Sequence, residues 1–148
     1  MRRSFLALAL LAFSFAAIAS EPVRVDLSRV DFKAQSAAIV DALNKNPNYV
    51  EVSAEKLKLV QASLDRILQI LGGSQSVSQL GVEESSEALA LQNSINAILD
   101  KGEKDSRWTC RLEKKLGTNL PTRVCSTAAE RNRQHEIAVE RRFDVYSN

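Results

Sequence analysis

The chain has 148 residues, a length that fits one folded domain with a modest core. Its formal net charge is +2, and two basic residues, Arg2 and Arg3, stand in the N-terminal segment. Without that segment the charges balance, which excludes a strongly basic or acidic domain and gives no indication of a partner.

The first twenty residues, "MRRSFLALALLAFSFAAIAS", follow the order of a secretory signal peptide. Basic residues precede an apolar run from Leu6 to Phe15, and the small residues Ala17 and Ala19 come next. We expect residues 1–19 to be a signal peptide, with cleavage before Ser20. An uncleaved membrane anchor is the alternative, but the apolar run is too short to span a bilayer.

Two consequences follow for the exported chain. No cysteine comes directly after the cleavage site, so no lipid attachment is expected. No later segment is apolar over the length of a membrane span, so we expect no stable membrane insertion. The expected location is the periplasm or the exterior.

A first helix is predicted from about Asp31, a plausible N-cap, to Lys45. Its apolar side chains fall on one side: Phe32, Ile39, Val40 and Leu43. The sequence Asn46-Pro47-Asn48 ends the helix, because the residue before a proline avoids the helical conformation. A short extended segment, "NYVEVS", is expected to follow.

The second helix has the clearest pattern in the chain, with Ser53 as its cap and Gly72-Gly73 at its end. Its stripe has spacings of three and four: Leu57, Val60, Leu64, Ile67, Leu68 and Leu71. The polar stretch "SQSVSQLGVEESS" after it is expected to be a loop and the most flexible point of the chain.

A third helix is predicted from about Glu83 to Lys101, with glutamates in its first turns and Gly102 as its stop. Its stripe is Ala88, Leu91, Ile95 and Ile98, with Leu99 alongside. Three amphipathic helices with short connections bury their stripes best against one another. We therefore predict a mainly α fold, with a small helical bundle over residues 20–102.

The only two cysteines, Cys110 and Cys125, have fourteen residues between them. In an exported protein a structural disulfide is the default for such a pair. Zinc needs four donors, and His135 is the only histidine. The spacing also differs from that of redox motifs. We predict a disulfide, and neither a metal nor a cofactor.

The position of Gly117 indicates the local shape around this disulfide. If the cysteines face each other across an antiparallel pair, the centre falls between Gly117 and Thr118. "LGTN" is then the turn, because glycine and Asn119 tolerate positive φ. Pro121 cannot donate a ladder hydrogen bond, so its strand is an edge or is bulged. Leu112 would lie opposite Arg123.

A helix is predicted to follow the second cysteine, because Thr127 and Glu130 form a capping-box pattern. It should reach about Arg142, with Ile137 and Phe143 among few apolar contacts, and lie at best on the surface of the bundle. We expect residues 103–148 to form the hairpin and this helix, packed on the same domain. His135 is expected to be a solvated helix residue.

The charge changes sign along the chain. Residues 21–100 hold 7 basic and 11 acidic side chains, whereas residues 101–148 hold 11 and 7. Around the predicted hairpin tip the basic residues are Arg111, Lys114, Lys115 and Arg123. These are the candidate binding residues. The alternative is that they serve solubility and discourage edge pairing. Trp108 is expected to pack over the disulfide, and the alternative is stacking on a ligand.

The stretch "DSRWTCRLEKKLGTNLPTRVCSTAAE" resembles a segment of small secreted proteins of unknown function from Gram-negative bacteria. The residues that match are Cys110, Arg111, Gly117, Thr118, Cys125 and Thr127. The resemblance covers about the last sixty residues. It implies export and a disulfide, and it supplies no activity.

The chain carries no metalloprotease, serine-hydrolase, phosphate-loop or dinucleotide motif. We therefore expect no catalytic residues and no enzyme. Two hypotheses remain for its function. The first is an accessory protein that docks an envelope or extracellular protein through the basic hairpin. The second is a binder of an anionic surface, such as an acidic polysaccharide, a lipid headgroup or, less in keeping with export, nucleic acid.

Overall fold

The structure is a computed structural model that describes residues 23–29, 31–74, 76–114 and 116–146. Side chains are described as far as Arg142. The predicted signal peptide at residues 1–19, its cleavage site before Ser20, and Lys115 lie outside the described residues.

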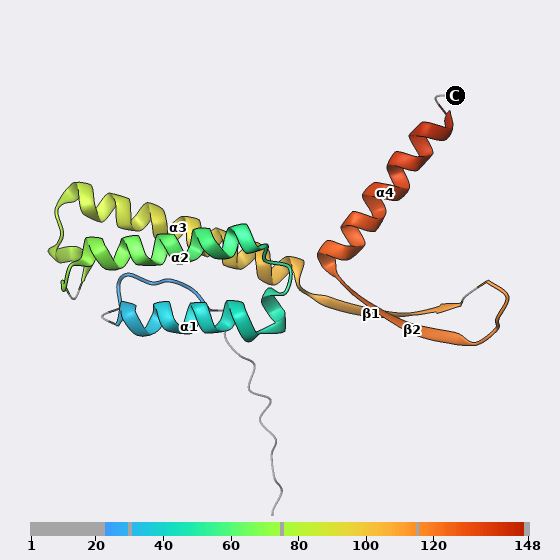
Figure 1. Cartoon of the computed structure of the whole chain (residues 1–148), viewed down its shortest axis with the longest axis horizontal. Helices are drawn as coiled ribbons and strands as arrows, with labels where there is room; N and C mark the ends of the chain where they lie inside the picture. The colour runs from blue at the N-terminus through green and yellow to red at the C-terminus, as the bar shows by residue number, and fades with distance from the viewer. Residues whose placement is uncertain (1–22, 30, 75, 115, 147–148) are drawn as a thin grey trace, which may run out of the picture.

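Three helices lie side by side and form a bundle (Figure 1). They are α1, Phe32–Lys45; α2, Ala54–Leu71; and α3, Val82–Asp105. Helix α2 contacts both α1 and α3. This arrangement confirms the predicted mainly α fold with a small helical bundle. Within the described ranges, no helix combines the length and the apolar character that a bilayer crossing requires.

The predicted caps of the first two helices are confirmed. The carboxylate of Asp31 accepts a hydrogen bond from the backbone N–H of Ala34 at 3.1 Å. The hydroxyl of Ser53 accepts one from the backbone N–H of Lys56 at 3.4 Å. Helix α2 ends at Gly72, whose φ of +52° is the left-handed conformation that glycine adopts most easily.

The core lies where the apolar stripes of the three helices meet. Its largest fully buried apolar side chains are Ile39, Val60, Leu64, Ile67, Ile95 and Leu99. The predicted stripes are wrong in detail at two places. Leu68 of α2 is 38% exposed. In α3 the buried residues are Ala88, Ile95, Leu99 and Gly102, whereas Leu91 and Ile98 are only partly buried.

A short N-terminal segment without regular secondary structure adds to the core, and no sequence pattern predicted it. Val25 and Leu27 of this segment are buried. Their backbone N–H groups donate to the side-chain carbonyls of Asn96 and Gln92 of α3, each at 2.8 Å. Two side-chain amides one helical turn apart thus accept the hydrogen bonds of buried backbone N–H groups that have no neighbouring strand to pair with.

Two connections differ from the expectations. The segment "NYVEVS" is not extended: Pro47–Tyr49 forms a 3-10 helix, η1, and buries Tyr49. Proline favours this outcome because its fixed φ suits the first helical position. The expected loop after α2 contains a second 3-10 helix, η2, at Val77–Gln79, and α3 already begins at Val82.

The predicted disulfide hairpin is confirmed. Strands β1, Trp108–Lys114, and β2, Pro121–Thr127, pair antiparallel with Cys110 opposite Cys125 and Leu112 opposite Arg123. Pro121 is the first residue of its strand, as a residue without an N–H donor requires.

Helix α4, Ala128–Tyr146, follows the hairpin and continues beyond the predicted end at Arg142. Figure 1 shows that α4 and the hairpin both extend away from one end of the bundle. At its base α4 contacts α3 and, through Arg133, Glu51. Among its described side chains, Ile137 and Val139 are both exposed.

Gly102 does not end the third helix as predicted. It lies inside α3, which continues to Asp105, and it is buried. A β-carbon at this position would overlap Cγ2 of Val52 and come within 3.5 Å of Cδ1 of Tyr49. Here the glycine allows the segment after η1 to cross close to α3.

We therefore expect Gly102→Ala to destabilise the protein by about 1–3 kcal/mol, the usual cost of overpacking. Helix propensity alone would predict that the substitution stabilises the protein, by up to about 1 kcal/mol, because alanine favours a helix more than glycine does. Urea unfolding followed by circular dichroism measures the difference. The matched control is Gly102→Ala combined with Val52→Ala, which should recover part of the loss. A single variant as stable as the wild type would contradict the close approach.

Candidate binding surface on the hairpin

The disulfide joins directly opposed residues of the hairpin. The Cα atoms of Cys110 and Cys125 are 4.0 Å apart, and the two residues form the third of the ladder's seven pairs, counted from its base. The turn lies between Lys114 and Pro121, and Gly117 has a φ of +86° there. Asn119 does not adopt the positive φ that its residue type allows.

Strand alternation sorts the hairpin side chains onto two faces. On one face lie the disulfide, Trp108, Leu112, Lys114 and Arg123, which we call the disulfide face. The other face carries Thr109, Arg111, Glu113, Thr122 and Val124. The four candidate binding residues are therefore not one cluster: Arg111 is on one face, Lys114 and Arg123 are on the other, and Lys115 lies outside the described residues.

The disulfide face is exposed. Trp108 is 54% exposed and Leu112 is 70% exposed. Because both cysteines are exposed as well, the expectation that Trp108 covers the disulfide is wrong. Two further leucines, Leu116 and Leu120, are exposed at the turn. The hairpin thus presents apolar side chains that the rest of the described chain leaves largely exposed.

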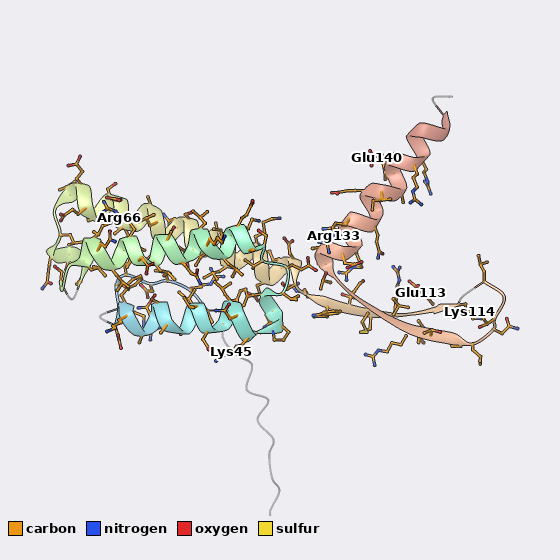
Figure 2. All side chains as sticks on the ribbon, viewed as in Figure 1. Lys45, Arg66, Glu113, Lys114, Arg133 and Glu140 are labelled. Atoms are coloured by element: carbon orange, nitrogen blue, oxygen red, sulfur yellow. A yellow bond between two sulfur atoms is a disulfide. The ribbon has the colours of Figure 1, made fainter. Side chains whose placement is uncertain are left out.

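The charges on the two faces differ in how they are paired. The guanidinium of Arg111 forms an ion pair with the carboxylate of Glu113 on the same strand. Within the described residues, Lys114 and Arg123 make no ion pair. Figure 2 shows the side chain of Lys114 on the outer part of the hairpin. The unpaired positive charges therefore belong to the disulfide face.

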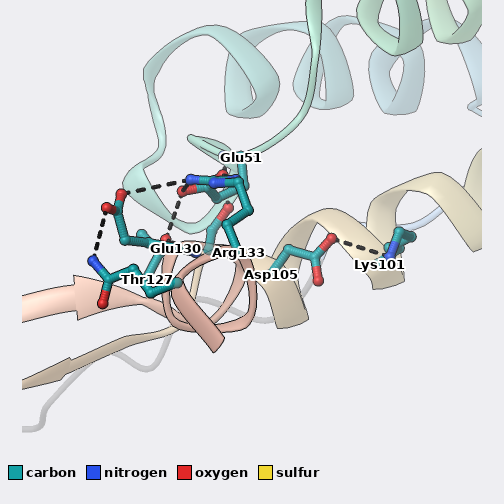
Figure 3. Close-up of polar contacts among 8 residues, drawn as sticks. Glu51, Lys101, Asp105, Thr127, Glu130 and Arg133 are labelled. Atoms are coloured by element: carbon teal, nitrogen blue, oxygen red, sulfur yellow. Dashed lines mark hydrogen bonds and ion pairs between the residues drawn. The ribbon is translucent and has the colours of Figure 1, made fainter. Parts of the chain in front are cut away.

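A polar joint connects the hairpin and α4 to the bundle (Figure 3). The hydroxyl of Thr127 donates to the carboxylate of Glu51 at 2.5 Å and accepts from the backbone N–H of Glu130 at 3.1 Å. Arg133 of α4 donates to the same carboxylate at 2.9 Å. The backbone N–H of Glu51 donates to the hydroxyl of buried Ser106 at 2.9 Å.

The cap of α4 is the one part of this joint that sequence patterns indicated. Thr127 caps that helix as predicted, but its buried hydroxyl also contacts a residue that lies far from it in sequence. Nothing in the sequence around Glu51 distinguishes it from a solvated glutamate. Within the described residues, no group of three or more histidine, cysteine, aspartate or glutamate side chains could hold a metal ion. His135 is exposed on α4.

Comparison with known proteins does not identify a relative. No protein-family model, no curated protein and no solved structure matches this chain.

The joint perturbs the protonation of its carboxyl group. The hydrogen bond from Arg133, followed by that from Thr127, holds the pKa of Glu51 below its ordinary value of 4.5. Since the folded-state pKa lies below that of the unfolded chain, the carboxylate stabilises the joint above the ordinary pKa. This contribution is lost as the pH falls through the lowered pKa.

We expect Glu51→Gln to weaken the joint by about 1 kcal/mol. This is less than the usual value for a buried hydrogen bond to a charged group, because Arg133 is exposed to solvent. The position of α4 relative to α2 should become more variable, which distance measurements between spin labels on the two helices detect. The variant should also lose the part of the acid dependence that Glu51 causes as the pH falls below the ordinary pKa of 4.5. Identical distance distributions in both proteins would contradict the role of this carboxylate.

Removing the disulfide should affect the hairpin and leave the bundle folded. In the variant Cys110→Ser with Cys125→Ser, we expect the hairpin to lose about 3 kcal/mol of local stability. Hydrogen exchange followed by mass spectrometry should show faster exchange in residues 108–127 and unchanged exchange in α2. Equal loss of protection in α2 would show that the hairpin and the bundle unfold together.

Proposed function

We propose that the chain is an exported, non-enzymatic binding protein that docks a protein partner through the disulfide face. One observation carries this proposal: Trp108 and Leu112 are exposed beside Lys114 and Arg123, although the helices bury apolar stripes of their own. Aromatic and arginine side chains are the residues that contribute most to protein interfaces.

The covalent and polar contacts of the hairpin support a docking role. The disulfide holds the two strands together, and the polar joint holds the base of the hairpin against the bundle. A surface that is ordered before binding loses less entropy on binding than a free loop does. The hairpin is therefore better suited to recognition than an unstapled loop of the same composition.

The charges of the disulfide face indicate the chemistry of the partner. Lys114 and Arg123 lack ion-pair partners within the described residues, and Arg123 lies directly opposite Leu112. The partner surface should therefore offer an apolar patch with carboxylates beside it. The guanidinium of Arg123 can hold a carboxylate through two parallel hydrogen bonds. In an exported protein, the partner would be an envelope or extracellular protein.

A second candidate function is binding to an anionic surface, and the turn is the observation that favours it. Leu116 and Leu120 are exposed there next to Lys114, an arrangement that suits the interface of an anionic membrane. Sedimentation with vesicles containing phosphatidylglycerol tests this alternative. Binding that persists at about 0.15 M salt and is abolished by Leu116→Ser with Leu120→Ser would favour it over a protein partner.

The variant Lys114→Gln with Arg123→Gln tests the proposed function. With a photo-crosslinking residue at Leu112, we expect the wild type to capture a defined envelope protein and the variant to capture at least about fivefold less, a loss of about 1 kcal/mol. The control, Lys56→Gln with Lys58→Gln, makes the same charge change on exposed positions of α2 and should leave capture unchanged. Equal yields from all three proteins would contradict the proposal.

A further inference from the structure

We propose that a second copy of this chain pairs with the outer edge of β1, so that two hairpins form a four-stranded antiparallel sheet in a symmetric dimer. This inference goes beyond the proposed function, because it concerns the edge of the hairpin and leaves the disulfide face open. A two-stranded sheet is marginally stable in water, whereas sheets of three or more strands are stable.

The spacing at the disulfide shows which backbone groups are available for pairing. The Cα atoms of Cys110 and Cys125 are 4.0 Å apart, close to the spacing of a pair without mutual hydrogen bonds. The backbone groups of such a pair point away from the neighbouring strand. The N–H and C=O groups of Trp108, Cys110, Leu112 and Lys114 therefore line the outer edge of β1.

The outer edge of β2 is less suited to strand addition. Pro121 supplies no N–H group at one end. At the other end the strand passes directly into α4. Of the two edges, β1 alone has a donor and an acceptor at each outward position.

The charges of β1 select the alignment of the two copies. In a pairing centred on Arg111 or on Glu113, that residue would face its own copy, and like charges directly opposite each other are unfavourable. In a pairing centred on Leu112, Arg111 of each copy lies opposite Glu113 of the other. The ion pair that these residues now form within one strand would then form twice between strands.

The same alignment places exposed apolar side chains of the two copies next to each other and leaves their outer face open. Leu112, 70% exposed, would face Leu112 of the second copy. Trp108 would lie level with Leu116 of the second copy, just beyond the end of its strand. Because the strands are antiparallel, the two basic turns point in opposite directions and repel each other little.

Charge reversal tests the dimer in the full chain, expressed for export and purified. Sedimentation equilibrium of the wild type should give the mass of a dimer. Arg111→Glu and Glu113→Arg should each raise the dissociation constant at least about tenfold, a change of about 1.4 kcal/mol. The double variant with both changes should restore the dissociation constant of the wild type. A wild type that is monomeric up to about 1 mM, or a dimer insensitive to these changes, would overturn the proposal.

A crosslink supplies a second test that does not depend on the stability of the charge variants. Leu112→Cys places two thiols at the centre of the pairing, at a Cα separation of about 5.5 Å, so oxidation should give a covalent dimer. In the control Arg123→Cys the thiols would be three strand spacings apart, about 14 Å, and should not crosslink. Peptide mapping confirms that the native disulfide is intact. Equal crosslinking of both variants, or none at Leu112, would overturn the proposed edge.

Discussion

The carboxylate of Glu51 determines where the hairpin and α4 stand relative to the bundle. It accepts hydrogen bonds from Thr127, the last residue of β2, and from Arg133, one turn into α4, while its backbone bonds to Ser106 at the end of α3. Beyond this joint, none of the described side chains of the hairpin or of α4 belongs to the hydrophobic core. Any surface that these two elements present is thus oriented by polar contacts rather than by burial.

Elements with strong local signals could be predicted from the sequence. The caps Asp31 and Ser53 lie next to periodic apolar runs, so they identify the starts of α1 and α2. The register of the hairpin followed from the two cysteines alone, because a disulfide between opposed residues fixes every other pair in an antiparallel ladder. One disulfide and a glycine turn leave little freedom for another alignment of the two strands.

Features that depend on distant residues could not be predicted. Gly102 resembles a helix stop in sequence, and only the approach of Val52 explains a glycine inside α3. The segment around Val25 is too short to show a period, and its partners Asn96 and Gln92 are indistinguishable from surface amides. The grouping of the candidate binding residues is a different case, because it depends on the hairpin register and on a neighbour two positions away. Arg111 and Arg123 lie near the same turn, but strand alternation places them on opposite faces of the hairpin, and Arg111 forms an ion pair with Glu113.

The close packing at Gly102 also makes α3 a rigid spacer whose length sets the direction of the hairpin. From this contact the helix continues for less than one turn before β1 begins, and Ser106 bonds to Glu51 on the way. Each residue of an α-helix turns the chain by about 100°. An insertion of one residue after Gly102 would swing the hairpin around the axis of α3 and break the joint, although both elements would keep their own contacts. The spacing between Gly102 and Trp108 is therefore under tighter constraint than the identity of the exposed residues between them.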